Sequence, residues 1–381
     1  MSTHRRYQGI VMPPHHTRGR GMSRRALLKG SGALATGLLI SPLVGGGRRA
    51  FAAVEDQLSM MGWADYISPD DIKIWEKMTG SKLIYDSYAS NDEMYSKLQL
   101  AKGNSGYDLG MNTDFMIPLL IKGHLIQQFD KSQIPNFKNV RPDIAGPDFD
   151  RPNDFTMPKS WGSEGFVYDK SVITRKMETW GDFLDAIRHE ASGRASLLDD
   201  PLAVAPLFWS KGVSWNTTNE AALKDAESQV EELAKHIKLF NSYPVQDVAG
   251  GTIVLAQCWN GNARQAIDQS KNPNLVFVYG APITEAWLDS YHLPTGGQRL
   301  KAAHSWVNYV LDPQVAAREI TYTGFLSPVS GVEKYLDPKV ASDSLIFPPA
   351  EVMKRGERTQ RNETYERRIH ILTKLKAAAT L

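Results

Sequence analysis

The stretch that decides the fold is residues 58–80, LSMMGWADYISPDDIKIWEKMTG. It opens with an apolar run of strand length, residues 58–62. Ser68 then predicts a helix N-cap, with a proline at the first helical position and two aspartates at the positive end of the helix. Gly80 predicts the end of that helix. A strand followed closely by an amphipathic helix is the unit from which α/β proteins are built.

The same alternation continues from residue 58 to about residue 310, so the sequence predicts α/β lobes with largely parallel sheets. Further strands are predicted at residues 82–85, 253–258 and 275–279, and further helices at 91–102, 218–238 and 361–375. The buried stripes are predicted to consist of Ile72, Trp75 and Met78 in the first helix and of Tyr365, Ile369 and Leu372 in the last.

Length and composition indicate an ordinary globular protein. The chain has 381 residues, 42% of them hydrophobic and 23% charged, which is enough for two domains and excludes a fibrous or disordered protein. Cys258 is the single cysteine, so the chain has no disulfide framework and no cysteine-based zinc site. We expect Cys258 to be a small buried residue on a strand.

The net charge of +2 conceals a basic leader. Residues 1–53 contain nine of the 44 Lys and Arg residues and no Asp or Glu. Residues 54–381 therefore contain 35 basic and 42 acidic residues, a formal charge of −7. This acidic body argues against nucleic-acid binding and is compatible with a cationic ligand.

The leader has the layout of a twin-arginine export signal. Arg24 and Arg25 precede a weakly apolar stretch at residues 31–47, and a small-residue cleavage site follows at residues 50–53, AFAA. The apolar stretch is too short for a confident membrane span. We expect cleavage near Ala53, export by the twin-arginine machinery, and a mature protein that is soluble in the periplasm or elsewhere outside the cytoplasm.

Nine short stretches, in the same order along nearly the whole mature chain, carry a resemblance to a known family. They are WADY at 63–66, YASNDEMY at 88–95, YDL at 107–109, WG at 161–162, LLDD at 197–200, FNS at 240–242, WNG at 259–261, WLDS at 287–290 and GFLSP at 324–328. In these stretches the chain resembles the spermidine/putrescine-binding proteins of ABC importers. These are periplasmic binding proteins with the second type of lobe topology.

The resemblance implies a fold of two hinged α/β lobes. The first lobe is expected to consist of residues 54–162 plus 287–328, and the second of 163–286 plus 329–381, with three crossings between them. The resemblance also implies a monomer that captures a small cationic ligand, a polyamine, and delivers it to an inner-membrane ABC permease. We expect no cofactor and no metal.

The site implied by the resemblance is an aromatic cleft closed by carboxylates. The family positions that surround the methylene chain match Trp63, Tyr66, Trp259, Trp287 and Phe325, those that bind ammonium groups match Asp200 and Asp289, and Ser242 matches a hydrogen-bonding serine. Asp65 is a further candidate because a tryptophan precedes it by two residues, as Trp287 precedes Asp289. Such a site suits a polyamine, since aromatic faces bury methylenes and attract cations.

Departures from the family pattern leave the ligand open. The family's spermidine binders have a glutamate where this chain has Ala203, and a tyrosine where it has Asp114. Asp114 is therefore a candidate replacement for the missing carboxylate. A glutamine of the family corresponds to either Thr359 or Gln360. A diamine, another polyamine, or a cation with a single amine all fit this pattern.

Other functions are compatible with parts of the sequence. No catalytic or phosphate-binding motif is present and the histidines are scattered, so an enzyme is the least favoured reading. The same fold could also present its ligand to a membrane sensor, or bind a quaternary amine or an aminophosphonate.

Overall fold

The computed structural model describes residues 54–379. The predicted export signal and its cleavage site therefore lie outside the described residues. Within residues 54–379, no helix has both the length and the apolar character needed to cross a membrane.

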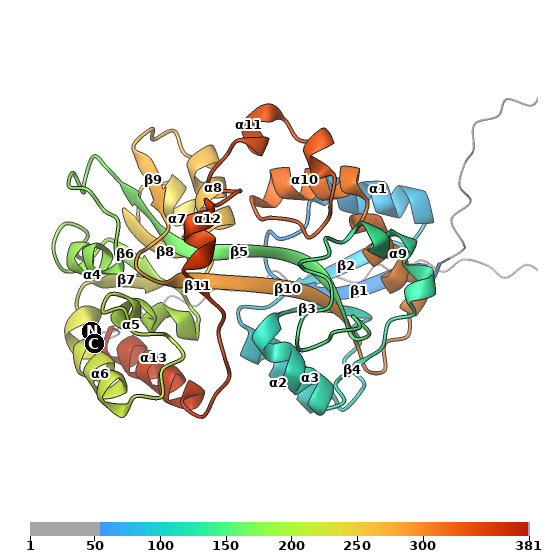
Figure 1. The fold of residues 1–381 in the computed structure, drawn as a ribbon, viewed down its shortest axis with the longest axis horizontal. Helices are drawn as coiled ribbons and strands as arrows, with labels where there is room; N and C mark the ends of the chain where they lie inside the picture. Colours follow the sequence, from blue (N-terminus) through green and yellow to red (C-terminus); the bar gives the residue numbers. More distant parts are fainter. Residues whose placement is uncertain (1–53, 380–381) are drawn as a thin grey trace, which may run out of the picture. The chain divides into compact units, whose positions relative to one another are not determined.

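The chain forms a mixed α/β structure (Figure 1). The strands are β1 Gln57–Gly62, β2 Lys82–Ser87, β3 Leu109–Thr113, β4 Ile126–Gln127, β5 Thr156–Asp169, β6 Ala195–Leu197, β7 Ile237–Phe240, β8 Leu255–Trp259, β9 Leu275–Val278, β10 Thr284–Pro294 and β11 Gly356–Glu357. The α-helices are α1 Pro69–Thr79, α2 Asn91–Ala101, α3 Ile117–Lys122, α4 Trp180–Arg188, α5 Pro206–Trp209, α6 Glu220–Ala234, α7 Val245–Ala249, α8 Asn260–Gln269, α9 Leu300–Val310, α10 Pro313–Thr323, α11 Pro338–Ala341, α12 Ala350–Lys354 and α13 Tyr365–Ala379.

The opening strand and helix form as the sequence predicts. The Ser68 side chain accepts a hydrogen bond from the backbone N–H of Asp71, and Gly80 ends α1 with a φ of 77°. The predicted buried stripe is only partly correct, because Trp75 is buried while Met78 is 39% exposed. Asp71 is buried in its place, since its carboxylate accepts hydrogen bonds from Tyr309 and Arg318.

Two further predicted helices have different bounds in the structure. The helix predicted at 218–238 ends at Ala234, and residues 237–240 form β7, which pairs with β6. The last helix begins at Tyr365, and its buried face includes Arg368 instead of Ile369. The Arg368 guanidinium lies 4.5 Å from the ring centroid of Trp215 and donates to the backbone carbonyl of Gln360, so its charge is satisfied although it is buried.

The sheet contains two parallel groups of strands joined by two antiparallel strands. β1 pairs in parallel with β2 and β3, and β6 pairs in parallel with β7 and β8. Between them lie β10 and β5, which give the order β2-β1-β3-β10-β5-β8-β6-β7. The expected parallel pairing is therefore confirmed within each group, and the pairing across the middle is antiparallel.

β5 and β10 extend through both groups of strands (Figure 1). The first half of β5 pairs with β10, and its second half pairs with β8 and β9. β10 pairs with β3 over residues 289–292. β10 thus joins the first group through β3, β5 joins the second group through β8, and their mutual pairing couples the two halves of the molecule.

The buried side chains fall into separate cores on the two sides of these strands. One core packs β1 and β3 against α9 and α10, with Trp75 and Trp306 at its centre. Another packs the second half of β5 against α4, α6 and α13. Residues 329–346 contribute Val329, Val332, Leu336, Val340 and Ile346 to the first of these cores.

Asp108 joins the first strand to the start of α9. Its buried carboxylate accepts backbone N–H bonds from Ser59 at 2.9 Å, from Gln298 at 3.0 Å and from Arg299 at 2.9 Å. The Arg299 guanidinium adds a salt bridge at 3.3 Å. The carboxylate thus satisfies three backbone donors from two distant segments.

We predict that Asp108→Ala lowers the free energy of unfolding by about 3–5 kcal/mol, because each buried donor left without a partner costs roughly 1–3 kcal/mol. Urea unfolding of the ligand-free protein measures this. The control is Asp70→Ala, whose side chain is 79% exposed and pairs with Lys73 on the surface of α1; it loses this surface pair and a charge at the helix N-terminus, so its effect should stay within about 1 kcal/mol. A loss below about 1 kcal/mol for Asp108→Ala would contradict the prediction.

Candidate functional site

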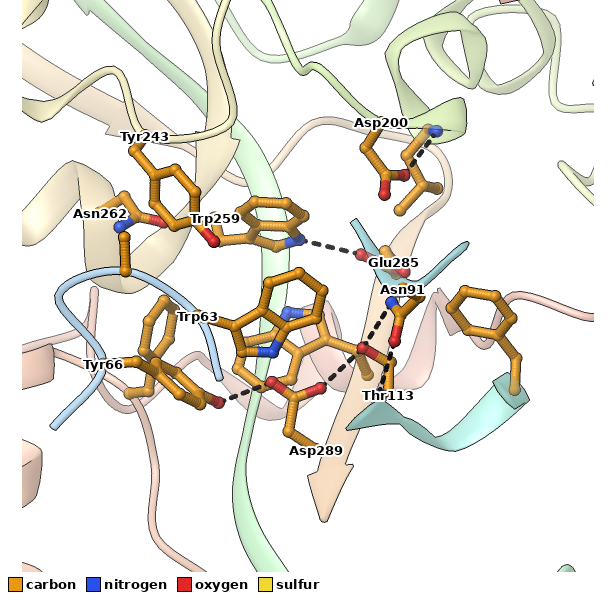
Figure 2. A pocket seen from close by; sticks show the side chains of 15 residues that line it. Trp63, Tyr66, Asn91, Thr113, Asp200, Tyr243, Trp259, Asn262, Glu285 and Asp289 are labelled. Carbon is orange, nitrogen blue, oxygen red and sulfur yellow. Dashed lines mark hydrogen bonds between the residues drawn. The ribbon is translucent and has the colours of Figure 1, made fainter. Parts of the chain in front are cut away.

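A cavity lies over the middle of β5 and β10 (Figure 2). Its volume is about 50 Å³, whereas a single buried water needs roughly 10–15 Å³. The cavity therefore has room for a small ligand. It is lined by Trp63, Ala64, Tyr66, Asn91, Thr113, Phe115, Asp200, Leu202, Tyr243, Trp259, Asn262, Glu285, Trp287, Asp289 and Phe325.

Most of the lining residues come from the ends of parallel strands. Trp63 directly follows β1, Thr113 ends β3, and Trp259 ends β8. The carboxyl ends of parallel strands leave a crevice where the chain turns away into helices, which is where open α/β sheets bind their ligands. Here the strand ends of both groups face the same crevice.

β10 supplies three side chains to one side of the cavity. Glu285, Trp287 and Asp289 alternate along the strand, and side chains two residues apart point to the same face. Gly162 of β5 lies opposite Trp287. A Cβ at Gly162 would lie 2.6 Å from Cζ2 of Trp287 and 2.7 Å from Oδ1 of Asn260, so only glycine leaves room for the indole ring.

The walls are aromatic and pack edge to face. The Phe325 ring lies 5.1 Å from that of Trp287 and 5.5 Å from that of Tyr66, measured between centroids. Trp63 packs against Tyr88 at 4.4 Å, and Tyr88 donates a hydrogen bond to the backbone carbonyl of Met111. These contacts hold the rings in place before any ligand enters.

Asp289 is a buried carboxylate at one end of the cavity. It is 4% exposed and accepts hydrogen bonds from Tyr66 Oη at 2.8 Å and from Thr113 Oγ1 at 2.7 Å. Burial raises the pKa of Asp289 to about 6, and the two hydroxyl donors limit that rise. Lys159 lies over the Tyr66 ring and is paired with Glu319, so it does not form a salt bridge with Asp289.

Glu285 and Asp200 bring two more carboxylates to the cavity (Figure 2). Glu285 is 2% exposed and accepts hydrogen bonds from Trp259 Nε1 at 3.1 Å and from Thr359 Oγ1 at 3.3 Å. Burial raises the pKa of Glu285 well above its usual range, and that of Asp200 to about 6. Within residues 54–379, no salt bridge neutralises either group. The cavity therefore combines apolar walls with acidic groups that lack a cation.

Seven of the ten residues expected from the sequence line this cavity. They are Trp63, Tyr66, Asp200, Trp259, Trp287, Asp289 and Phe325.

The other three lie outside the cavity. Asp65 is exposed, with a φ of 52°. Asp114 is buried and forms a salt bridge with Arg358 at 3.3 Å, in an adjoining cavity of about 680 Å³. Ser242 accepts a hydrogen bond from the backbone N–H of Asp199 at 3.0 Å, so it fixes the loop that carries Asp200.

The sequence reasoning missed Glu285, the most buried carboxylate that lines the cavity. The signal was present, because the two-residue spacing that places Asp289 beside Trp287 also places Glu285 on the same face. Thr359 and Gln360 were equivalent in sequence. The structure separates them, since Thr359 is buried and bonds Glu285, whereas Gln360 is exposed.

The start of α13 and the residues just before it also contact the first turn of α2. Asp92 accepts hydrogen bonds from Arg361 at 2.5 Å and from Tyr365 at 3.2 Å. Together with the Arg358 to Asp114 salt bridge, these contacts join segments that belong to different cores.

The chain matches the family model for bacterial extracellular solute-binding proteins over residues 72–348. With that match over more than half its length, the chain belongs to the family of bacterial extracellular solute-binding proteins.

Within that family the similarity is to polyamine-binding members. The chain is 31% identical over 333 residues to the spermidine/putrescine-binding periplasmic protein of Escherichia coli K12, covering 87% of this chain and 91% of that protein. It is 27% identical over 336 residues to the putrescine-binding periplasmic protein PotF of the same organism, covering 84% and 89%. The resemblance inferred from the nine sequence stretches is confirmed.

The fold is also that of a solved structure, the spermidine/putrescine ABC transporter substrate-binding protein PotD from Streptococcus pneumoniae. The TM-score is 0.70 at 22% identity, with 85% of this chain and 100% of that chain covered. The predicted α/β binding-protein fold is confirmed.

The raised carboxyl pKa values make the stability of the ligand-free protein depend on pH. Asp289 and Asp200 hold their protons more tightly in the folded protein than in the unfolded chain. They therefore favour folding at low pH, and this contribution is lost as pH rises through about 6.

We predict that the free energy of unfolding of the ligand-free protein falls between pH 5 and pH 7.5, and that Asp289→Asn removes about 1 kcal/mol of that fall. Urea unfolding at several pH values measures both slopes. The exposed Asp65→Asn is the matched control and should keep the parent slope. If the free energy of unfolding of the parent rises steadily over this range, the cavity carboxylates do not dominate its pH dependence.

Proposed function

We propose that this chain is the extracytoplasmic substrate-binding component of an ABC importer, and that it binds a polyamine of the putrescine/spermidine class. One observation carries the proposal: a small aromatic cavity is lined by the buried carboxylates Asp289 and Glu285 and the partly buried Asp200, none of them paired in a salt bridge within residues 54–379. Its relatives carry the names of spermidine/putrescine-binding and putrescine-binding periplasmic proteins.

The physical chemistry of a polyamine matches both features of this cavity. Each methylene buried against an aromatic wall contributes about 0.8 kcal/mol, and an aromatic face attracts a nearby cation by roughly 0.5–2 kcal/mol. A buried carboxylate then binds each ammonium with a charge-assisted hydrogen bond. An anionic or uncharged solute would leave the carboxylates without a partner.

The two-lobe division remains our proposal. The lobes 54–162 plus 287–328 and 163–286 plus 329–381 are supported by the separate cores and by the passage of β5 and β10 between them. The packing of residues 329–346 with the first core favours assigning that segment to the first lobe. The Arg361 to Asp92 and Arg358 to Asp114 pairs would then hold the lobes closed.

The remaining features of the proposal follow from the family. It is a family of substrate-binding transport proteins and not of enzymes. We infer that the partner is an ABC permease, that the protein acts outside the cytoplasmic membrane, and that it works as a monomer.

We also propose that residues 1–53 direct export by the twin-arginine machinery and are cleaved near Ala53. Conservative replacement of both arginines, Arg24→Lys with Arg25→Lys, should strongly reduce export, since this route requires the arginine pair. Fractionation of cells that express the full chain measures it. Normal export of the double variant would rule out this route.

For the cavity, we predict that Asp289→Asn weakens putrescine and spermidine binding by about 2–5 kcal/mol, because a desolvated ammonium loses its charge partner. Trp259→Ala should cost less, on the order of 1–3 kcal/mol, because it removes one apolar wall. Isothermal titration calorimetry gives both values, with thermal unfolding as the check on folding.

Asp65→Asn serves as the control, since Asp65 lies outside the cavity and is exposed. It should bind both amines like the parent. If Asp289→Asn binds within about threefold of the parent, a difference below roughly 0.7 kcal/mol, Asp289 is not the ammonium partner. If the folded parent binds no amine at all, the polyamine assignment itself is wrong.

A further inference from the structure

We propose that Glu285, supported by Glu164, holds the second ammonium group of a linear diammonium ligand whose first ammonium group is held by Asp289. This inference rests on the proposed function and specifies the substrate class of the same cavity. In this proposal the carboxylate that is absent at Ala203 is replaced by Glu285 on β10, next to Glu164 on β5, and not by Asp114.

The spacing along β10 sets the separation of the two ends. Glu285 and Asp289 both line the cavity and are four residues apart on one strand face, with Trp287 between them. Four residues of strand span about 13 Å. Two charge-assisted hydrogen bonds of roughly 2.8 Å occupy part of that distance. What remains is the length of a short alkyl chain that crosses the face of Trp287.

Glu164 stands beside Glu285 on the neighbouring strand. β5 and β10 pair with Ser163 opposite Ala286, and the next position of this register places Glu164 opposite Glu285. Side chains directly opposite in an antiparallel pair have Cβ atoms roughly 4.5–5.5 Å apart. The two carboxyl groups are therefore neighbours, of which Glu285 lines the cavity and Glu164 is buried beside it.

Glu164 carries an unused acceptor. Its side chain is 0% exposed, its Oε1 accepts a hydrogen bond from Gln257 Nε2 at 2.6 Å, and its Oε2 has no partner. A fully buried carboxyl oxygen without a donor is costly. An ammonium group has three N–H donors and would supply the missing hydrogen-bond donor.

Asp114, the replacement that the sequence suggested, is already paired. Arg358 forms a salt bridge with it at 3.3 Å, and it faces the adjoining cavity. Among the described residues, the hydrogen-bond donors to Glu285 are the neutral side chains of Trp259 and Thr359. Of Asp114 and Glu285, the carboxyl group that still needs a cation is therefore that of Glu285.

Other charged groups that act on Glu285 are also acidic. Glu164 on β5 and Asp200 after β6 lie close enough to raise the pKa of the buried pair, and Asp114 adds to the effect on Glu285. Burial and mutual repulsion thus favour a shared proton on the empty pair. When the ammonium group binds, it takes the place of that proton, which leaves to the solvent, so charge is balanced.

The test is isothermal titration calorimetry of the mature protein at pH 7 with putrescine and with butylamine, its analogue with a single ammonium group. Each titration is run in two buffers of different ionisation enthalpy, so that proton release is measured. Glu285→Gln should weaken putrescine binding at least tenfold, leave butylamine binding within threefold of the parent, and remove most of the proton release. Asp65→Asn is the control and should match the parent.

A second variant keeps the charge and changes only its position. Glu285→Asp withdraws the carboxylate by one methylene, and we expect the preference to shift from putrescine towards the longer cadaverine. Thermal unfolding confirms that each variant is folded.

The outcomes separate this inference from the proposed function. If the parent prefers putrescine and Asp289→Asn abolishes binding, while Glu285→Gln keeps the parent's preference for putrescine over butylamine within threefold, the second ammonium site is not at Glu285. An unchanged chain-length preference in Glu285→Asp would also overturn it. If the parent binds neither amine, the proposed function and this inference both fail.

Discussion

The antiparallel pairing of β5 with β10 is the constraint on which the rest of the structure depends. β10 supplies three residues that line the cavity, and the pair joins the parallel group that β10 meets through β3 to the group that β5 meets through β8. Their register places Gly162 under Trp287, and a side chain at Gly162 would collide with the indole ring. A slip of one residue would turn Glu285, Trp287 and Asp289 to the opposite face of the sheet. Fold and site are thus set by the same hydrogen-bond ladder.

The site holds negative charge where water is excluded, which is unfavourable until a cation arrives. Asp289 and Asp200 have pKa values of about 6, because burial destabilises their ionised forms. The hydroxyl groups of Tyr66 and Thr113 orient the Asp289 carboxylate without neutralising it. This arrangement costs stability in the empty protein, and ligand binding recovers that cost. Within residues 54–379 no salt bridge occupies these carboxylates, which is the basis of the proposed preference for cations.

Local signals in the sequence predicted the first strand and the caps of α1, whereas the aromatic character of the site was implied by the family resemblance. Ser68 and Gly80 act through contacts with their own helix, so spacing alone located them. Long-range contacts explain what was missed. Arg368 can be buried because its guanidinium packs on the Trp215 ring and donates to the carbonyl of Gln360. Asp114 forms a salt bridge with Arg358, 244 positions later in the chain. Glu285 could have been found from strand alternation, but the role of Glu164 depends on a register that no local pattern encodes.

The central claim is that ionised, buried carboxylates bind the ammonium groups of the ligand. The most direct measurement is the affinity of the unmodified protein for putrescine between pH 8 and pH 5, with folding monitored at each pH. A carboxyl group of pKa about 6 is roughly one-tenth ionised at pH 5, so the affinity should fall at least tenfold over this range. An affinity that stays within threefold from pH 8 to pH 5, in a protein that remains folded, would contradict the account.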